Sequence, residues 1–210
     1  ALAAPGISSI ACPASSDVVL FGGDDFDLEY SLPFTFPFFG RDIVNININT
    51  NGLVELLESG ESCSECDDYE THCDGEHIAN DIDAIFAAND DLETGVLVTE
   101  SANSVEITWG GATYDDADTY GYNGYEILFK VTLFSDGRVQ WHFMDMNYDS
   151  YCDLFSGVYD EVGDTEYEVP GGSTSFQGDN VNTCFEFDPN TPGISSIACP
   201  ASSDVVLFGG

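Results

Sequence analysis

The sequence is nearly devoid of basic residues. Three Lys and Arg residues stand against 39 Asp and Glu residues, so the formal net charge is -36 at pH 7. A surface of this sign repels phosphate backbones and anionic membranes, and we expect no nucleic-acid partner. Most of the acidic residues are expected to solvate a surface. Because so acidic a chain repels itself unless ions screen it, divalent cations are the expected remedy.

Long apolar runs and glycosylation sequons are also absent. No stretch approaches the roughly 18 apolar residues that a membrane-spanning helix requires, so we expect no membrane span. No Asn-x-Ser/Thr sequon occurs, which argues against N-linked glycan. O-linked sugar, or a glycan partner, stays open.

Residues suited to acid–base catalysis near neutral pH are scarce. The chain has three histidines, no Gly-x-Ser-x-Gly elbow and no phosphate-binding loop. Carboxylate pairs such as Asp81 and Asp83 are unavoidable among 39 acidic residues, so they do not indicate a glycosidase. The sequence therefore predicts a protein that is not an enzyme.

Cysteine, in contrast, is plentiful. Cys199 is a duplicate of Cys12 within a repeated segment, so one repeat carries six cysteines, a number compatible with three disulfides and an oxidising, extracellular location. Six cysteines allow 15 pairings, and the sequence does not choose among them. The seven candidates are Cys12, Cys63, Cys66, Cys73, Cys152, Cys184 and Cys199. The spacing of Cys63, Cys66 and Cys73 with His72 and His77 imitates a zinc site, but in an exported chain disulfides are favoured.

The feature that organises the chain is an exact repeat. The 19 residues 5–23 return unchanged at 192–210, an offset of 187 residues, which indicates one full unit followed by the opening of the next. We therefore divide the chain into an N-terminal repeated segment (1–23), a β domain (24–191) and the second copy (192–210). The second copy either starts the next repeat of a tandem array or is a strand donated to the next subunit. If Cys199 takes the part of Cys12 in a following unit, the junction is covalently stapled.

The repeated segment contains an apolar strand closed by a glycine pair. An uncovered strand of this kind is an aggregation hazard, so we expect it to be buried in a neighbouring unit. The predicted polymerisation residues are Val18, Val19, Leu20, Phe21, Ile194, Ile197, Val205, Val206, Leu207 and Phe208.

The rest of the chain shows strand patterns and almost no helical periodicity. Val44, Ile46 and Ile48 alternate with asparagines, which predicts a strand with one buried face, and Asn51-Gly52 predicts a hairpin turn. Prolines in the run 33–40 place it at a sheet edge. Lys130, the only lysine, is expected on a solvated face. About ten such strands with frequent turns predict an all-β, antiparallel β-sandwich with short strands and disulfide-stapled loops.

Several motifs, in order, resemble the NIDO domain, the extracellular module named from nidogen. They are Leu32-Pro33-Phe34, Phe36-Pro37-Phe38-Phe39-Gly40, Asn49-Thr50-Asn51-Gly52-Leu53, Ile78 with Asp81-Ile82-Asp83, Gly95-Val96, Ile107-Thr108-Trp109, and Phe129 to Trp141 around Ser135-Asp136-Gly137. The resemblance covers residues 28–160 and implies a secreted or surface-displayed, non-catalytic β module. Ala79-Asn80 replaces the Pro-Phe-Trp expected before the paired aspartates, and the loop 59–76 is extra.

Three acidic clusters are candidate calcium sites. Asp145-x-Asn147-x-Asp149 reproduces the alternating oxygen ligands that open a calcium loop, but Ser150 replaces the expected glycine and Ser156 the expected glutamate, so this is not an EF-hand. Clusters of the same kind are Asp115, Asp116 and Asp118, and Asn89, Asp90 and Asp91. The alternative for each cluster is a solvated turn held by Asx hydrogen bonds.

Together these features predict a structural subunit of an extracellular filament that polymerises head to tail through the repeated segment. The alternative is a calcium-dependent extracellular adhesion module that binds a protein or glycan partner.

Overall fold

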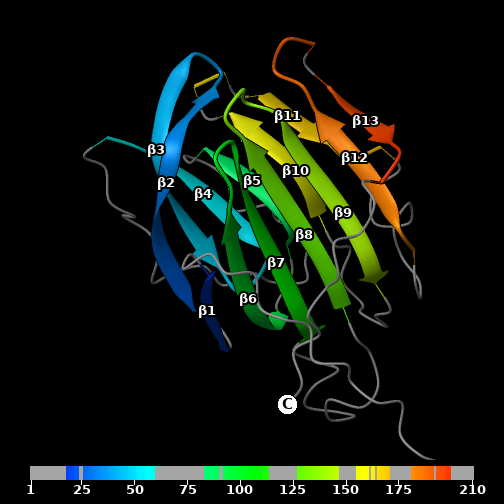
Figure 1. Cartoon of the computed structure of the whole chain (residues 1–210). Helices are drawn as coiled ribbons and strands as arrows, with labels where there is room; N and C mark the ends of the chain where they lie inside the picture. Colours follow the sequence, from blue (N-terminus) through cyan, green and yellow to red (C-terminus); the bar gives the residue numbers. More distant parts are fainter. Residues whose placement is uncertain are drawn as a thin grey trace, which may run out of the picture.

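The structure is a computed structural model of the whole chain. It describes residues 18–23, 26–59, 83–89, 92–113, 127–146, 155–160, 162–163, 165–170, 181–191 and 193–199. Thirteen strands and no helix occur in these ranges, and none of these residues belongs to a helix able to cross a membrane. The strands form two antiparallel sheets, which confirms the all-β sandwich (Figure 1).

The larger sheet has seven strands in the order β1-β6-β7-β8-β9-β12-β13. Their bounds are β1 (Val18–Gly23), β6 (Leu92–Glu100), β7 (Ser104–Thr113), β8 (Ile127–Phe134), β9 (Val139–Met146), β12 (Thr183–Phe187) and β13 (Ile194–Ile197). The smaller sheet has six strands in the order β11-β10-β5-β4-β3-β2. Their bounds are β11 (Thr165–Glu168), β10 (Phe155–Asp160), β5 (Ala84–Asn89), β4 (Leu53–Glu58), β3 (Arg41–Asn49) and β2 (Asp27–Phe38).

One hydrophobic core fills the space between the two sheets. Apolar residues at alternate positions of β7, β8 and β9 point into it, because successive side chains of a strand face opposite sides of its sheet. Two tryptophans of the larger sheet also donate hydrogen bonds to main-chain carbonyls of the smaller sheet. Trp109 Nε1 donates to Asn49 O at 2.9 Å, and Trp141 Nε1 donates to Phe86 O at 2.8 Å. Burial and these bonds fix the two layers against each other.

The predicted proline-rich edge strand is confirmed. Pro33 and Pro37 lie in β2, which forms the outer edge of the smaller sheet, the place in a sheet where proline is tolerated. The Asn51-Gly52 hairpin turn is also confirmed, between β3 and β4, with Gly52 N bonded to Asn49 O.

The simple alternation predicted for residues 44–49 is wrong in two respects. A β-bulge between Ile43 and Asn45 shifts the register, so Ile43 is fully buried and Val44 only half-buried. Asn47 and Asn49 are buried as well, and both amide groups donate to the Asp27 carboxylate. The asparagines are therefore part of a buried polar network rather than a solvated face.

The turn after β3 is a buried polar junction. Asn51 Oδ1 accepts from Leu92 N at 3.0 Å, and Thr94 Oγ1 donates to Thr50 O at 2.6 Å. Each bond joins the turn to β6 of the other sheet. The Asn-Thr-Asn-Gly motif thus serves to position the two sheets.

Candidate assembly site

The first edge of the seven-stranded sheet is formed by the first copy of the repeated segment. Strand β1 pairs antiparallel with β6 over its whole length, from Val18 opposite Thr99 to Gly23 opposite Thr94. Gly22 makes this pairing close. A Cβ at that position would lie 2.7 Å from Thr94 O and 2.9 Å from the Gly95 Cα atom. The edge therefore requires glycine at position 22.

The opposite edge is formed by the second copy. Strand β13 pairs antiparallel with β12, with Ile197 opposite Cys184 and Ile194 opposite Phe187, and Ile194 packs against the core. Just beyond β13, Cys199 forms a disulfide with Cys184, with a Cα–Cα distance of 5.1 Å. The second copy is thus held to the sheet by a ladder and by a covalent bond.

Figure 1 shows these two edges on opposite sides of one sheet, β1 in dark blue and β13 in red. In the part of the chain that the structure describes, no strand pairs with the outer side of either β1 or β13. The predicted polymerisation residues Val18 to Phe21 form the one edge, and Ile194 and Ile197 form the other. Val205, Val206, Leu207 and Phe208 lie outside the described residues.

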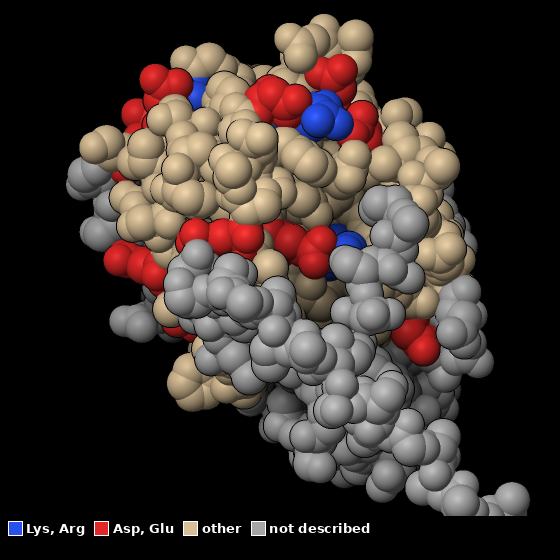
Figure 2. Space-filling model, viewed as in Figure 1, with Lys and Arg blue, Asp and Glu red and all other residues tan. Residues whose placement is uncertain are grey.

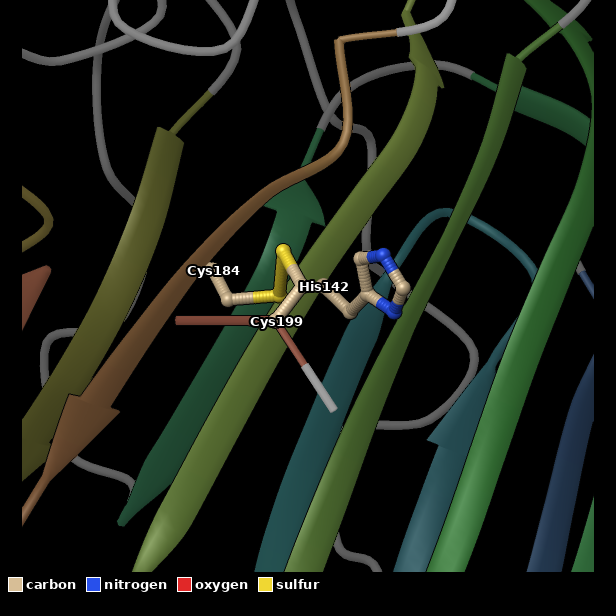
Figure 3. Close-up of side chains that lie close together, drawn as sticks. All are labelled: His142, Cys184 and Cys199. Carbon is tan, nitrogen blue, oxygen red and sulfur yellow. A yellow bond between two sulfur atoms is a disulfide. The ribbon is translucent and has the colours of Figure 1, made fainter. Parts of the chain in front are cut away.

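A buried histidine lies beside the disulfide. His142, on β9, is the direct cross-strand neighbour of Cys184 on β12 (Figure 3). Its cross-strand neighbour on the other side is Lys130 on β8. His142 Nε2 bonds to Asn182 Oδ1 at 2.9 Å, and Asn182 O lies 3.1 Å from Cys199 Sγ. Because an amide oxygen accepts only, Nε2 carries the proton. Among the described residues Nδ1 has no hydrogen-bond partner.

The ligand atoms of His142, Cys184 and Cys199 all lie within 4.8 Å of one another, a group of the kind that can hold a metal ion. The two sulfurs are bonded to each other, however, and thiolates are the form of cysteine that binds metals. In this state the group is a disulfide packed against a neutral imidazole.

Burial lowers the pKa of His142 below its ordinary value of 6.5, and the positive charge of Lys130 acts in the same direction. The hydrogen bond that His142 donates to Asn182 and the charge of Glu106 oppose the shift. The unfolded chain therefore binds this proton at a higher pH than the folded chain. Protonation of His142 therefore favours the unfolded chain. The free energy of unfolding is unaffected by this group above pH 6.5 and decreases as the pH falls below 6.5.

We expect this loss to disappear in His142→Gln. Denaturant titrations at about pH 7.5 and pH 5.5 should show that the wild type loses more free energy of unfolding than the variant, by at most about 1.4 kcal/mol per pH unit for one proton. The many carboxylates are common to both proteins, so the comparison isolates the histidine. Equal pH dependence in the two proteins would contradict the assignment.

The outer face of the seven-stranded sheet carries an ion pair next to His142. Lys130 Nζ lies 2.7 Å from Glu106 Oε2, and Lys130 is only 7% exposed. The expectation of a solvated lysine is therefore wrong, because its charge is compensated by Glu106 on β7. Glu106, Lys130, Gln140, His142 and Cys184 line a hollow of about 210 Å³ together with neighbouring side chains. Side chains that line the hollow can form hydrogen bonds and carry paired charges, but Cys184 is in a disulfide and offers no thiolate nucleophile.

All three basic side chains of the protein engage carboxylates. Arg41 pairs with Asp83 and Asp160, Lys130 with Glu106, and Arg138 with Asp136 and Glu186. Acidic side chains are spread over the face seen in Figure 2, and its few basic side chains lie beside acidic ones. The excess negative charge has no protein cation left to compensate it.

Most predicted calcium ligands lie outside the described residues, namely Asp115, Asp116, Asp118, Asn147 and Asp149. Asp145 lies in β9, next to the bulge opposite Leu128 and Phe129. Of the predicted disulfide cysteines, Cys12, Cys63, Cys66, Cys73 and Cys152 also lie outside the described residues.

Two features of this site escaped sequence reasoning. The pairing of Cys184 with Cys199 is one of many that the sequence allows, and only the antiparallel register of β12 and β13 selects it. The burial of Lys130 and His142 was hidden because both alternate with core residues, which is typical of a solvated face. The register between β8 and β9 places them side by side.

Comparisons with protein-family models, with curated proteins and with solved structures find no match to this chain.

Proposed function

We propose that this protein is a structural subunit of an extracellular filament and that it polymerises head to tail through the repeated segment. The observation that supports the proposal is the placement of the two copies. One copy supplies the strand at one edge of the seven-stranded sheet, and the other copy supplies the strand at the opposite edge.

Opposite edges suit a head-to-tail contact. The contact joins two different surfaces, so it can repeat from unit to unit, and it gives an open chain of units when the rotation between units does not close a ring. In a tandem array each unit contacts only its neighbours, and cohesion is a sum of similar junctions. The disulfide at β13 fits an oxidising, extracellular setting.

The acidic surface fits a filament held in the presence of cations. With a net charge of -36 per chain, adjacent units repel one another over a distance of about 8 Å at physiological ionic strength. Divalent cations, calcium first among them, would reduce this repulsion and bridge neighbouring acidic faces.

A pair of matched glycine variants tests which copy forms the first edge. Gly22→Ala places a methyl group against the Thr94 carbonyl and should lower the free energy of unfolding by about 1–3 kcal/mol. Gly209→Ala, the same change in the same 19-residue context, should leave the stability of the 210-residue chain unchanged, because the proposal places Gly209 in the next unit. Chemical denaturation of both variants provides the measurement. Equal destabilisation by the two changes would contradict this placement.

Two assays on native material test the function itself. Boiling under reduction separates a covalent array, which gives a ladder or a very large chain, from separate subunits, which give one band near the mass of one unit. Sedimentation with calcium and with a chelator separates the filament from the calcium-dependent adhesion module. A filament gives large species of many lengths. An adhesion module gives discrete species that bind a partner surface only when calcium is present.

A further inference from the structure

We propose that the 19-residue segment is a joint shared by two consecutive units and that the Cys184–Cys199 disulfide is its staple. The first half of the segment completes the sheet of the preceding unit, and the second half opens the sheet of the following unit. This inference rests on the proposed head-to-tail assembly and specifies the partner of each half.

The strands that the structure describes support this division. The seven-stranded sheet uses the second half of copy one, residues 18–23, as β1 and the first half of copy two, residues 194–197, as β13. The remaining halves, residues 7–10 and 205–210, have the same sequences as these two strands. In a head-to-tail array, residues 7–10 become the β13 strand of the unit before, and residues 205–210 become the β1 strand of the unit after. Each half of the segment then belongs to one unit, and each seven-stranded sheet has both its β1 strand and its β13 strand.

The joint is short. Five residues, 200–204, separate Cys199 from the start of the second apolar stretch at Val205. At about 3.3–3.6 Å per residue, this length of chain spans roughly 20 Å at most. The first strand of the following unit is therefore held close to the disulfide of the preceding one, so successive units abut rather than hang on a long linker.

The position of the disulfide gives it a mechanical role. Strand β13 is an edge strand of four residues, held on one side only, and a pull on the following chain would peel it from β12. The bond from Cys199 to Cys184 transfers that pull directly to β12, which is paired on both sides with β9 and β13. The chain between the two cysteines, which are 15 residues apart in the sequence, therefore does not bear the force.

Formation of the staple needs ordinary extracellular chemistry. Two thiols lose two electrons and two protons to a disulfide oxidant by thiol–disulfide exchange, and the oxidant is released as a dithiol. In a tandem chain the sequence identity of the copies gives Cys12 the same partner as Cys199, namely the Cys184 position of the unit before.

Two serine variants in identical sequence contexts test the joint in the full 210-residue chain. Alkylation of the native protein followed by mass spectrometry should find Cys12 as a free thiol and Cys184 bonded to Cys199. Cys12→Ser should leave that bond intact and abolish the free thiol. Cys199→Ser should expose Cys184 to alkylation in the monomer, in addition to Cys12. A reduction-sensitive oligomer that joins Cys12 of one chain to Cys184 of another would also support the joint.

A Cys12–Cys184 bond within a monomer, in the wild type or in Cys199→Ser, would overturn the inference, because copy one would then close its own unit. Should Cys199→Ser fold poorly, Cys184→Ser gives the same test, since it should free Cys199 and leave Cys12 unchanged. Failure of the joint and failure of the proposed filament give different results. Filaments with the wrong disulfide remove the joint alone, whereas the predicted disulfide in particles that never form filaments removes the filament alone.

Discussion

Replacing Arg41 by leucine should lower the free energy of unfolding by about 3–5 kcal/mol, the cost of leaving buried charges without their partner. Arg41 stands at the start of β3 and bonds to Asp83, which precedes β5, and to Asp160, at the end of β10. The side chains of Asp83 and Asp160 are 7% and 9% exposed, and that of Arg41 is 17% exposed. Without the guanidinium, two carboxylates would face each other in a region with little water.

The matched control for this change is Arg138→Leu. Arg138 also pairs with two carboxylates, Asp136 and Glu186, but its side chain is 34% exposed and that of Asp136 is 57% exposed. Exposed ion pairs contribute about 0–1 kcal/mol, so this variant should remain nearly as stable as the wild type. Urea denaturation of the three proteins at neutral pH measures the difference. Similar losses of free energy of unfolding in both variants would show that burial does not make the Arg41 ion pairs more stabilising than those of Arg138.

Trp109→Ala should cost about 3–5 kcal/mol, because it empties a large volume between the two sheets. The indole is fully buried, stacks on Phe129 with ring centroids 5.3 Å apart, and donates its N–H to Asn49 O. Loss of the side chain removes packing from β7 and β8 and also removes a link to the turn that follows β3.

Trp109→Phe separates these two contributions. It keeps most of the apolar contact and removes the hydrogen bond to Asn49 O, which retains a second donor in Gly52 N at 3.3 Å. We therefore expect a smaller loss, about 1–3 kcal/mol. Thermal and chemical unfolding of both variants provides the measurement. A loss in Trp109→Phe as large as in Trp109→Ala would place the stabilisation in the hydrogen bond rather than in the packing.

The sequence predicts much of this fold because, in several strands and turns, the local pattern of residues alone determines the structure. Alternating apolar residues in β7, β8 and β9 each face the core, and Ser135-Asp136-Gly137 forms the turn between β8 and β9. Proline at positions 33 and 37 excludes β2 from the centre of a sheet, whatever the rest of the chain does.

Other features depend on contacts that no local pattern contains. The bulge in β3 follows from pairing with β4, and it decides which of Ile43 and Val44 is buried. The local pattern predicts Lys130 and His142 to be surface residues. The register of β7, β8 and β9 places Glu106 and Cys184 beside them. An antiparallel register joins residues that are distant in sequence, so it is set by the whole sheet.

The repeated segment shows the same limit at the level of the whole chain. Its identity at 5–23 and 192–210 indicates an array, and its apolar residues indicate burial in a sheet. Which half forms which edge of the sheet follows only from the fold, where β1 and β13 take opposite edges. This division of one short segment between two edges underlies both the proposed filament and the proposed joint.

The most direct test of the filament is negative-stain electron microscopy of native material, with and without a calcium chelator. We predict long, uniform filaments, which fray or separate from one another in chelator because their acidic faces then repel one another. Discrete particles, or short flexible chains of unequal units, would contradict the filament and favour the adhesion module.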